Sequence, residues 1–234
     1  MCFSPEASFA GGVIISAIGL ATVKKVHKPS QIVFASIPLF FGAQQFIEGF
    51  VWLSFSQPEF MHYHRLFTTL FLLFADVFWP MMIPLAVLHM EKNDKRKKIL
   101  RILLVLGLSV SLYYGYCLLF FNVTPQIMGY HIQYTSDYPK ILSLIAFVLY
   151  LITSITPLFV STIQRTKILG IFMSLSCLVT LIFFTQFLTS VWCFFAALIS
   201  AVIYWILRDA KRVYILDKAA LEKVLPVTLQ INEQ

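Results

Sequence analysis

Apolar residues run in seven long stretches that are separated by short polar linkers. A helix crosses a bilayer with about 20 apolar residues, because each residue rises about 1.5 Å and the hydrocarbon core is about 30 Å thick. The qualifying stretches are roughly Phe9–Val23, Ile32–Phe55, Leu66–Met90, Ile99–Phe121, Ile141–Ile163, Ile168–Phe187 and Val191–Leu207. The pattern predicts an all-α, polytopic transmembrane bundle of seven spans over residues 1–208, followed by a short cytoplasmic tail over residues 209–234.

Two alternatives bear on this prediction. Almost no linker separates the last two stretches, so six spans are the alternative to seven. A soluble helical bundle needs polar helix faces, and the segments Phe67–Phe74 and Ile99–Leu106 offer almost none. The composition, 59% hydrophobic and 12% charged, is also outside the range of soluble domains. We therefore expect a membrane protein whose first partner is the lipid bilayer.

Basic residues fall in every second linker. They follow the first, third, fifth and seventh stretches as Lys24, Lys25 and Lys28; Lys92, Lys95, Arg96, Lys97 and Lys98; Arg165 and Lys167; and Arg208, Lys211 and Arg212. Basic flanks stay in the cytoplasm, which predicts an outside N-terminus and a cytoplasmic C-terminus. The net charge of +7 is explained by this topology, so we expect no nucleic-acid partner.

Several polar residues lie inside the apolar stretches, where ionisable groups usually face the interior of the bundle. Gln44, Gln45, Glu48 and Trp52 are spaced so that they share one side of a helix, which predicts a polar cavity at the outer half of the second span. Asp76 lies near the middle of the third span, shortly before Trp79-Pro80. It could serve as a buried proton or cation site, or only hydrogen-bond between helices.

The predicted outer rim carries chemically competent groups. They are Cys2, Glu6, His131, Tyr134, Trp192 and Cys193. With Glu48, the two cysteines and His131 could bind a divalent metal such as zinc. Alternatively, Cys2 could act as a nucleophile beside a base, or pair with Cys193 in a disulfide. The spacing matches no standard zinc or hydrolase motif.

Five segments resemble an uncharacterised family of bacterial seven-helix integral membrane proteins. They are the opening Met-Cys-Phe-Ser-Pro-Glu-Ala-Ser-Phe, Phe41–Trp52, Phe78-Trp79-Pro80, His131-Ile132-Gln133-Tyr134 and Ser190–Ala197. The resemblance implies that the rim residues, together with Gln44, Gln45, Glu48 and Trp52, belong to the family's pattern, and that the protein lies in the bacterial inner membrane. It implies no activity.

Three functions fit an outward-facing polar pocket that binds a small molecule or a metal. A membrane-embedded metal- or thiol-dependent enzyme would use Cys2, Glu48, His131 and Cys193 in catalysis. The substrate would then contact Glu6, Gln44, Gln45, Trp52, Asp76, Tyr134 and Trp192. A small-solute or ion-coupled transporter with a three-one-three helix layout would instead depend on Asp76 at the midplane. A receptor or sensor is the third candidate.

Overall fold

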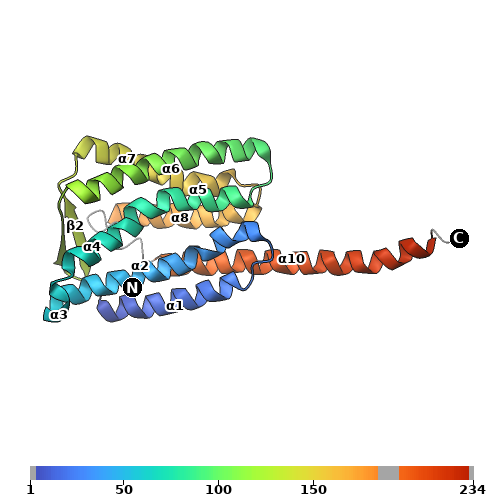
Figure 1. Cartoon of the computed structure of the whole chain (residues 1–234), viewed down its shortest axis with the longest axis horizontal. Helices are drawn as coiled ribbons and strands as arrows, with labels where there is room; N and C mark the ends of the chain where they lie inside the picture. The colour runs from blue at the N-terminus through green and yellow to red at the C-terminus, as the bar shows by residue number, and fades with distance from the viewer. Residues whose placement is uncertain (1–3, 184–194, 232–234) are drawn as a thin grey trace.

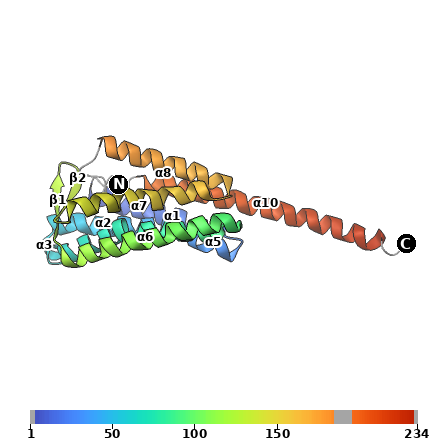
Figure 2. The ribbon, with the colours of Figure 1, turned by 90° about the horizontal axis from the view of Figure 1, so that it is seen from above.

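The computed structural model describes residues 4–183 and 195–231, and in it long helices lie side by side in one bundle (Figures 1 and 2). The long single helices are α1 (Pro5–Val23), α2 (Ile32–Ser56), α6 (Asp94–Phe120), α7 (Lys140–Val160), α8 (Gln164–Phe183) and α10 (Ala196–Ile231). One further rod joins α4 (His64–Leu72), a π-helical segment η2 (Leu73–Phe78) and α5 (Trp79–Met90). The prediction of a mainly helical chain is confirmed.

Short elements occupy the linkers. The 3₁₀ turn η1 (Pro29–Gln31) precedes α2, and α3 (Pro58–Met61) follows it. The strands β1 (Val123–Met128) and β2 (His131–Ser136) form an antiparallel hairpin between α6 and α7. The hairpin lies across one end of the bundle, at the left in Figure 1. The pattern of apolar and polar residues did not predict this hairpin.

Six helical segments among the described residues are long and apolar enough to cross a membrane. They are Pro5–Val23, Pro29–Ser56, His64–Met90, Asp94–Phe120, Lys140–Val160 and Gln164–Phe183. The chain is therefore a multi-pass membrane protein. The seventh predicted span, Val191–Leu207, begins outside the described residues. Its remainder opens α10, which packs on α1, α2 and α8 through buried residues such as Ile199 and Ile203, and the count of seven stays a prediction.

Polar residues in the linkers define where several helices begin. The Ser4 hydroxyl accepts a hydrogen bond from the Ala7 backbone N–H at 3.2 Å, and Pro5 occupies the first turn of α1. The Asn93 side chain accepts from the Arg96 N–H at 3.2 Å at the start of α6. Such caps satisfy backbone donors that the first helical turn leaves free. They therefore fix the helix ends at the linkers.

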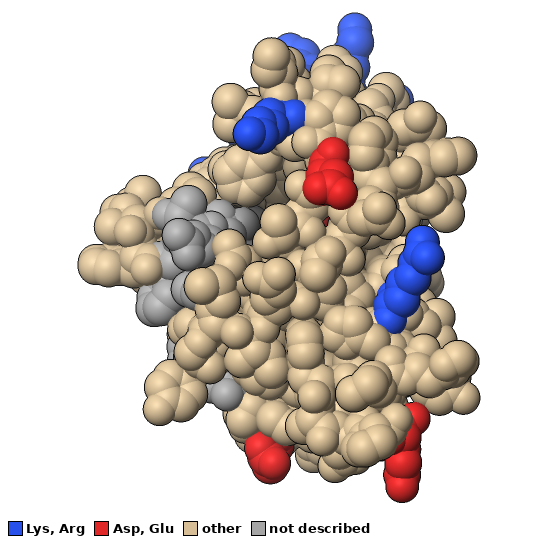
Figure 3. All heavy atoms as spheres, turned by 90° about the vertical axis from the view of Figure 1, so that its left-hand side faces the viewer, with Lys and Arg blue, Asp and Glu red and all other residues tan. Residues whose placement is uncertain are grey.

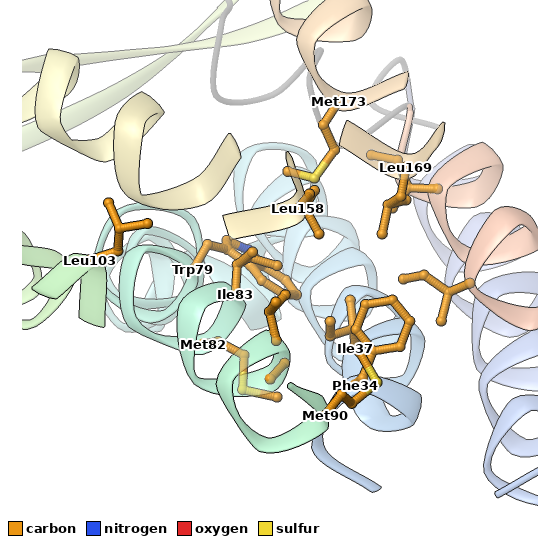
Figure 4. Close-up of a cluster of buried hydrophobic side chains, with 14 of the residues drawn as sticks. Phe34, Ile37, Trp79, Met82, Ile83, Met90, Leu103, Leu158, Leu169 and Met173 are labelled. Atoms are coloured by element: carbon orange, nitrogen blue, oxygen red, sulfur yellow. The ribbon is translucent and has the colours of Figure 1, made fainter. Parts of the chain in front are cut away.

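Glycine allows two pairs of helices to approach closely. A Cβ atom at Gly107 of α6 would overlap the Pro80 carbonyl oxygen of α5, and one at Gly42 of α2 would overlap the Ser16 hydroxyl of α1. Small residues at helix interfaces allow backbones to approach closely in membrane proteins. Between these contacts the core is apolar: Phe34, Ile83 and Leu158 come from three different helices and belong to one buried cluster, in which Ile83 and Leu158 lie beside Trp79 (Figure 4).

The basic linkers meet at one end of the bundle, opposite the hairpin. Lys211 donates to the Lys24 carbonyl oxygen at 3.1 Å, and Arg165 pairs with Asp209. Arg96 donates to the carbonyl oxygens of Val160 and Ser161 at 2.7 and 2.9 Å. The hairpin end is mostly uncharged (Figure 3). This separation is the arrangement that an alternating topology requires, although the orientation in a membrane stays a prediction.

Candidate functional site

The continuous helix α4–η2–α5 widens into the π-helical segment η2 at the depth where the site lies. In a π-helix the N–H of a residue bonds the carbonyl five positions earlier. Pro80 has no N–H, so the carbonyl of Ala75 receives no bond from that position. The Tyr150 hydroxyl of α7 donates to this carbonyl at 2.8 Å, and the Ser111 hydroxyl of α6 donates to the Val77 carbonyl at 2.6 Å. Two neighbouring helices therefore stabilise an irregular backbone at membrane depth.

Trp79 joins this segment to α2. Its indole N–H donates to the Gln44 side-chain oxygen at 2.8 Å, and its ring stacks on Phe41 with the centroids 4.1 Å apart. Both Trp79 and Gln44 are buried. The hydrogen bond and the ring contact together fix the orientation of Gln44, a residue that helical spacing alone assigned to the interior.

The hairpin supplies one wall of the site. Met128 pairs with His131 across a two-residue turn whose first residue, Gly129, has φ of 63°. Glycine adopts this conformation without strain, and a turn of this kind suits tight hairpins. Side chains alternate along a strand, so Tyr134 shares the inner face with buried Ile132. Tyr134 stacks on Phe71 with the ring centroids 5.1 Å apart.

These elements enclose a cavity of about 510 Å³, within the usual size range of small-molecule sites. Its polar lining residues are Gln44, Asp76, Tyr114, Tyr134, Ser136, Tyr138, Lys140, Ser143, Tyr150 and Ser154. Its aromatic and aliphatic walls include Phe41, Trp79, Ile83, Phe147, Met173 and Ile199. The exposed lining residues Ser136, Lys140 and Leu144 lie where β2 ends and α7 begins, so the cavity opens at the hairpin end.

Asp76 is the acidic residue of the cavity lining. It is partly exposed, and no described residue forms a hydrogen bond or ion pair with its carboxylate. Its charge affects a neighbouring tyrosine: burial raises the pKa of Tyr138, and the negative charge of Asp76 raises this pKa further. The site therefore combines an unpaired acidic group with aromatic walls.

The chain matches a family of unknown function, DUF6629, over residues 1–217. The chain belongs to this family. No curated protein and no solved structure matches it. The expectation of an uncharacterised family is thus confirmed, and the function has to be argued from the site itself.

The structure divides the predicted site residues of this family member. Gln44, Asp76 and Tyr134 line the cavity. Gln45 and Glu48 are buried on α2, where the Gln45 amide donates to the Glu48 carboxylate at 3.1 Å, but neither lines it. The Gln45 side-chain oxygen is buried without a hydrogen-bond partner among the described residues, as is the indole N–H of Trp52. The cavity-lining residue Gln44 and the buried Gln45–Glu48 pair therefore lie on neighbouring parts of α2.

The remaining predicted residues lie elsewhere. His131 is half-buried on the strand face opposite Tyr134, and burial lowers the pKa of its imidazole. Glu6 is exposed in the first turn of α1. Cys2, Trp192 and Cys193 lie outside the described residues. Within residues 4–183 and 195–231, no three His, Cys, Asp or Glu side chains gather in a way that would hold a metal ion.

The sequence pattern did not indicate most of the cavity wall. Tyr114, Tyr138, Lys140 and Tyr150 line it, and none of them was proposed as a site residue. Tyrosine is common both in membrane interfaces and in helix cores, so its type gave no signal. The polar residues Tyr150 and Ser154 lie four positions apart on α7, a helical spacing that would have marked an inward stripe.

Proposed function

We propose that this membrane protein binds a small organic molecule in the cavity between α2, the continuous helix α4–η2–α5, α6 and α7, and that it acts as a carrier. The observation that carries the proposal is the cavity itself, about 510 Å³ in volume with Asp76, Gln44 and Tyr134 in its lining. Binding sites for small molecules are typically concave and mostly apolar, with a few polar groups that orient the ligand.

The depth of Asp76 favours a carrier over an enzyme. Asp76 lies near the middle of the span His64–Met90, about 18 Å along the helix from His64 at a rise of about 1.5 Å per residue. The span is interrupted there by the π-helical segment and by Pro80. Carriers typically bind their substrate near the bilayer midplane, beside helices that are broken at that depth.

An enzyme is the second candidate, and the Gln45–Glu48 pair supports it. Glu48 is fully buried and accepts a hydrogen bond from Gln45, an environment that can tune a carboxyl for acid–base chemistry. Its proposed catalytic partners are less favourable. His131 does not line the cavity with Asp76, and Cys2 and Cys193 lie outside the described residues.

A cavity-filling variant tests the binding proposal. Ser154 is buried in the cavity wall, so Ser154→Phe should occupy part of the space. Leu108→Phe on the outer surface of α6 is the matched control. A panel of small organic molecules is screened for an increase in the Tm of the protein in nanodiscs. We expect compounds that stabilise the wild type and Leu108→Phe but not Ser154→Phe; equal responses of the two variants would contradict the proposal.

Transport separates the two candidate activities. Each stabilising compound is then tested for exchange across proteoliposomes and for chemical conversion. A carrier should lose exchange in Asp76→Asn and keep it in Glu48→Gln. If the compound is converted, and Glu48→Gln abolishes conversion while Asp76→Asn does not, the protein is an enzyme instead.

A further inference from the structure

The chemistry of the cavity wall points to the charge of its ligand, provided that the proposed function is correct. Seven of the lining residues that surround the space are aromatic: Phe41, Trp79, Tyr114, Tyr134, Tyr138, Phe147 and Tyr150. The face of an aromatic ring is negative, so it attracts a cation that lies over it. Such walls also accommodate an apolar body, which a hydrated inorganic ion lacks.

Asp76 adds a full negative charge to this environment. An ionised carboxylate at membrane depth is unstable unless a proton or a cation neutralises it. The described residues offer no such partner, since their ion pairs are Lys97–Asp94 and Arg165–Asp209, both away from the cavity. The cavity therefore requires either a proton on Asp76 or a cation from outside the protein.

The other groups that face Asp76 do not replace this partner. Tyr114 of α6, Tyr134 of β2, Tyr138 of the following loop and Tyr150 of α7 line the cavity, and tyrosine is neutral near pH 7 because its ordinary pKa is about 10. Lys140 is exposed at the mouth. The amide of Gln44 and the apolar side chains of α8 and α10, Met173 and Ile199, complete the lining.

We propose that the cavity binds an organic cation, with its positively charged nitrogen at Asp76 and its apolar body against the aromatic rings, in exchange for a proton. The cation and the proton neutralise the same carboxylate, so they compete. A divalent metal is a poor occupant, because it needs several oxygen, nitrogen or sulfur ligands at once, and Asp76 is the carboxylate of the lining.

A pair of isosteric probes tests the charge preference. Benzyltrimethylammonium and neopentylbenzene have the same shape, and the first carries a positive nitrogen where the second has carbon. Binding of each to the protein in nanodiscs is measured by calorimetry at about pH 8 and about pH 5, on either side of neutrality. At the higher pH we expect the ammonium to bind at least about tenfold more tightly than neopentylbenzene, as a desolvated charge pair over aromatic faces allows. Lowering the pH should weaken the binding of the ammonium and leave the binding of neopentylbenzene unchanged.

Variants connect the preference to Asp76. Asp76→Asn should remove the preference and leave the binding of neopentylbenzene unchanged, whereas Asp76→Glu should retain it. Asp137→Asn makes the same chemical change at an exposed residue near the mouth and should behave as the wild type. Retained cation preference in a folded Asp76→Asn protein would overturn the inference; if that variant does not fold, the pH dependence and Asp76→Glu decide it.

The outcomes separate this inference from the proposed function. If neopentylbenzene binds as tightly as the ammonium, the inference is wrong although the cavity binds small molecules. If neither probe binds, the inference is also wrong, and the comparison of Ser154→Phe with Leu108→Phe then judges the cavity independently.

Discussion

At the scale of single residues, buried polar groups hold parts of this chain together that are far apart in sequence. Glu91 is 3% exposed and connects the linker after α5 to the linker after α7. Its carboxylate accepts from the Thr162 N–H at 2.7 Å and the Thr162 hydroxyl at 2.8 Å, and from the backbone N–H groups of Lys92 and Asn93 at 2.9 Å. Burial alone would raise the pKa of Glu91, but these hydrogen bonds together lower it below its ordinary value.

Glu91 should therefore contribute stability that depends on pH. Because its pKa is lower in the folded state, the contribution is complete above the pKa of the unfolded chain and is lost as the pH falls through the lower, folded value. Glu91→Gln should reduce the free energy of unfolding by about 1–3 kcal/mol at neutral pH, since backbone donors lose a charged acceptor.

The measurement is thermal unfolding in detergent from about pH 7 down to about pH 3, across the ordinary glutamate pKa. The difference between wild type and Glu91→Gln should shrink on acidification. Glu59→Gln, at an exposed position in α3, is the control. A Glu91→Gln protein with the stability of the wild type at neutral pH would contradict the proposed role.

At the scale of elements, both the local sequence and the neighbouring helices influence the backbone geometry of the continuous helix α4–η2–α5. Pro80 predicts a disturbance one turn earlier, and a disturbance occurs there as η2. Tyr150 and Ser111, which lie on other helices, donate hydrogen bonds to the Ala75 and Val77 carbonyl oxygens of this π-helical segment. Helix packing adds a second constraint, because the backbone of α5 approaches α6 at Gly107.

Two glycines of α6 test this close approach. A Cβ atom at Gly107 would overlap the Pro80 carbonyl oxygen, whereas one at Gly115 meets nothing within 4 Å. Gly107→Ala should destabilise the protein by about 1–3 kcal/mol, as overpacking does. Gly115→Ala should be neutral or stabilising by up to about 1 kcal/mol, because alanine favours the helix. Equal Tm values for the two variants in detergent would show that α5 and α6 do not approach this closely.

At the scale of the whole molecule, the structure gathers the basic linkers at one end and the cavity mouth at the other. The fold alone does not determine which end of the bundle faces the cytoplasm, but anionic lipid and the insertion machinery favour basic flanks on the cytoplasmic side. With the basic end in the cytoplasm, the hairpin and the mouth of the cavity face outward. The beginning of α10 then has to cross the membrane if its basic residues Arg208 and Lys211 are also to lie inside.

Reporter fusions test both the orientation and the number of spans. Fusions after Lys98 and Arg212 should score as cytoplasmic, and a fusion after Phe183 should score on the other side. A non-cytoplasmic result after Lys98 would reverse the orientation. The same side for Phe183 and Arg212 would reduce the count to six spans.

The fold class and the membrane location could be predicted from the sequence because span length and hydrophobicity are local properties of a segment. Helical spacing likewise assigned Gln44, Gln45 and Glu48 to the interior, where all three are buried. The hairpin was missed although Gly129 offered a turn signal, since six-residue strands carry a weak pattern beside long apolar helices.

The choice of which polar residues share a cavity depended on the tertiary structure. Gln44 meets Trp79, and Tyr150 meets Ala75, across 35 and 75 positions of the chain. Such contacts depend on how helices rotate and pack against one another, and the periodicity of one segment does not encode that rotation. This is why Gln44 and Asp76 line the same space while Glu48, one turn from Gln44, does not.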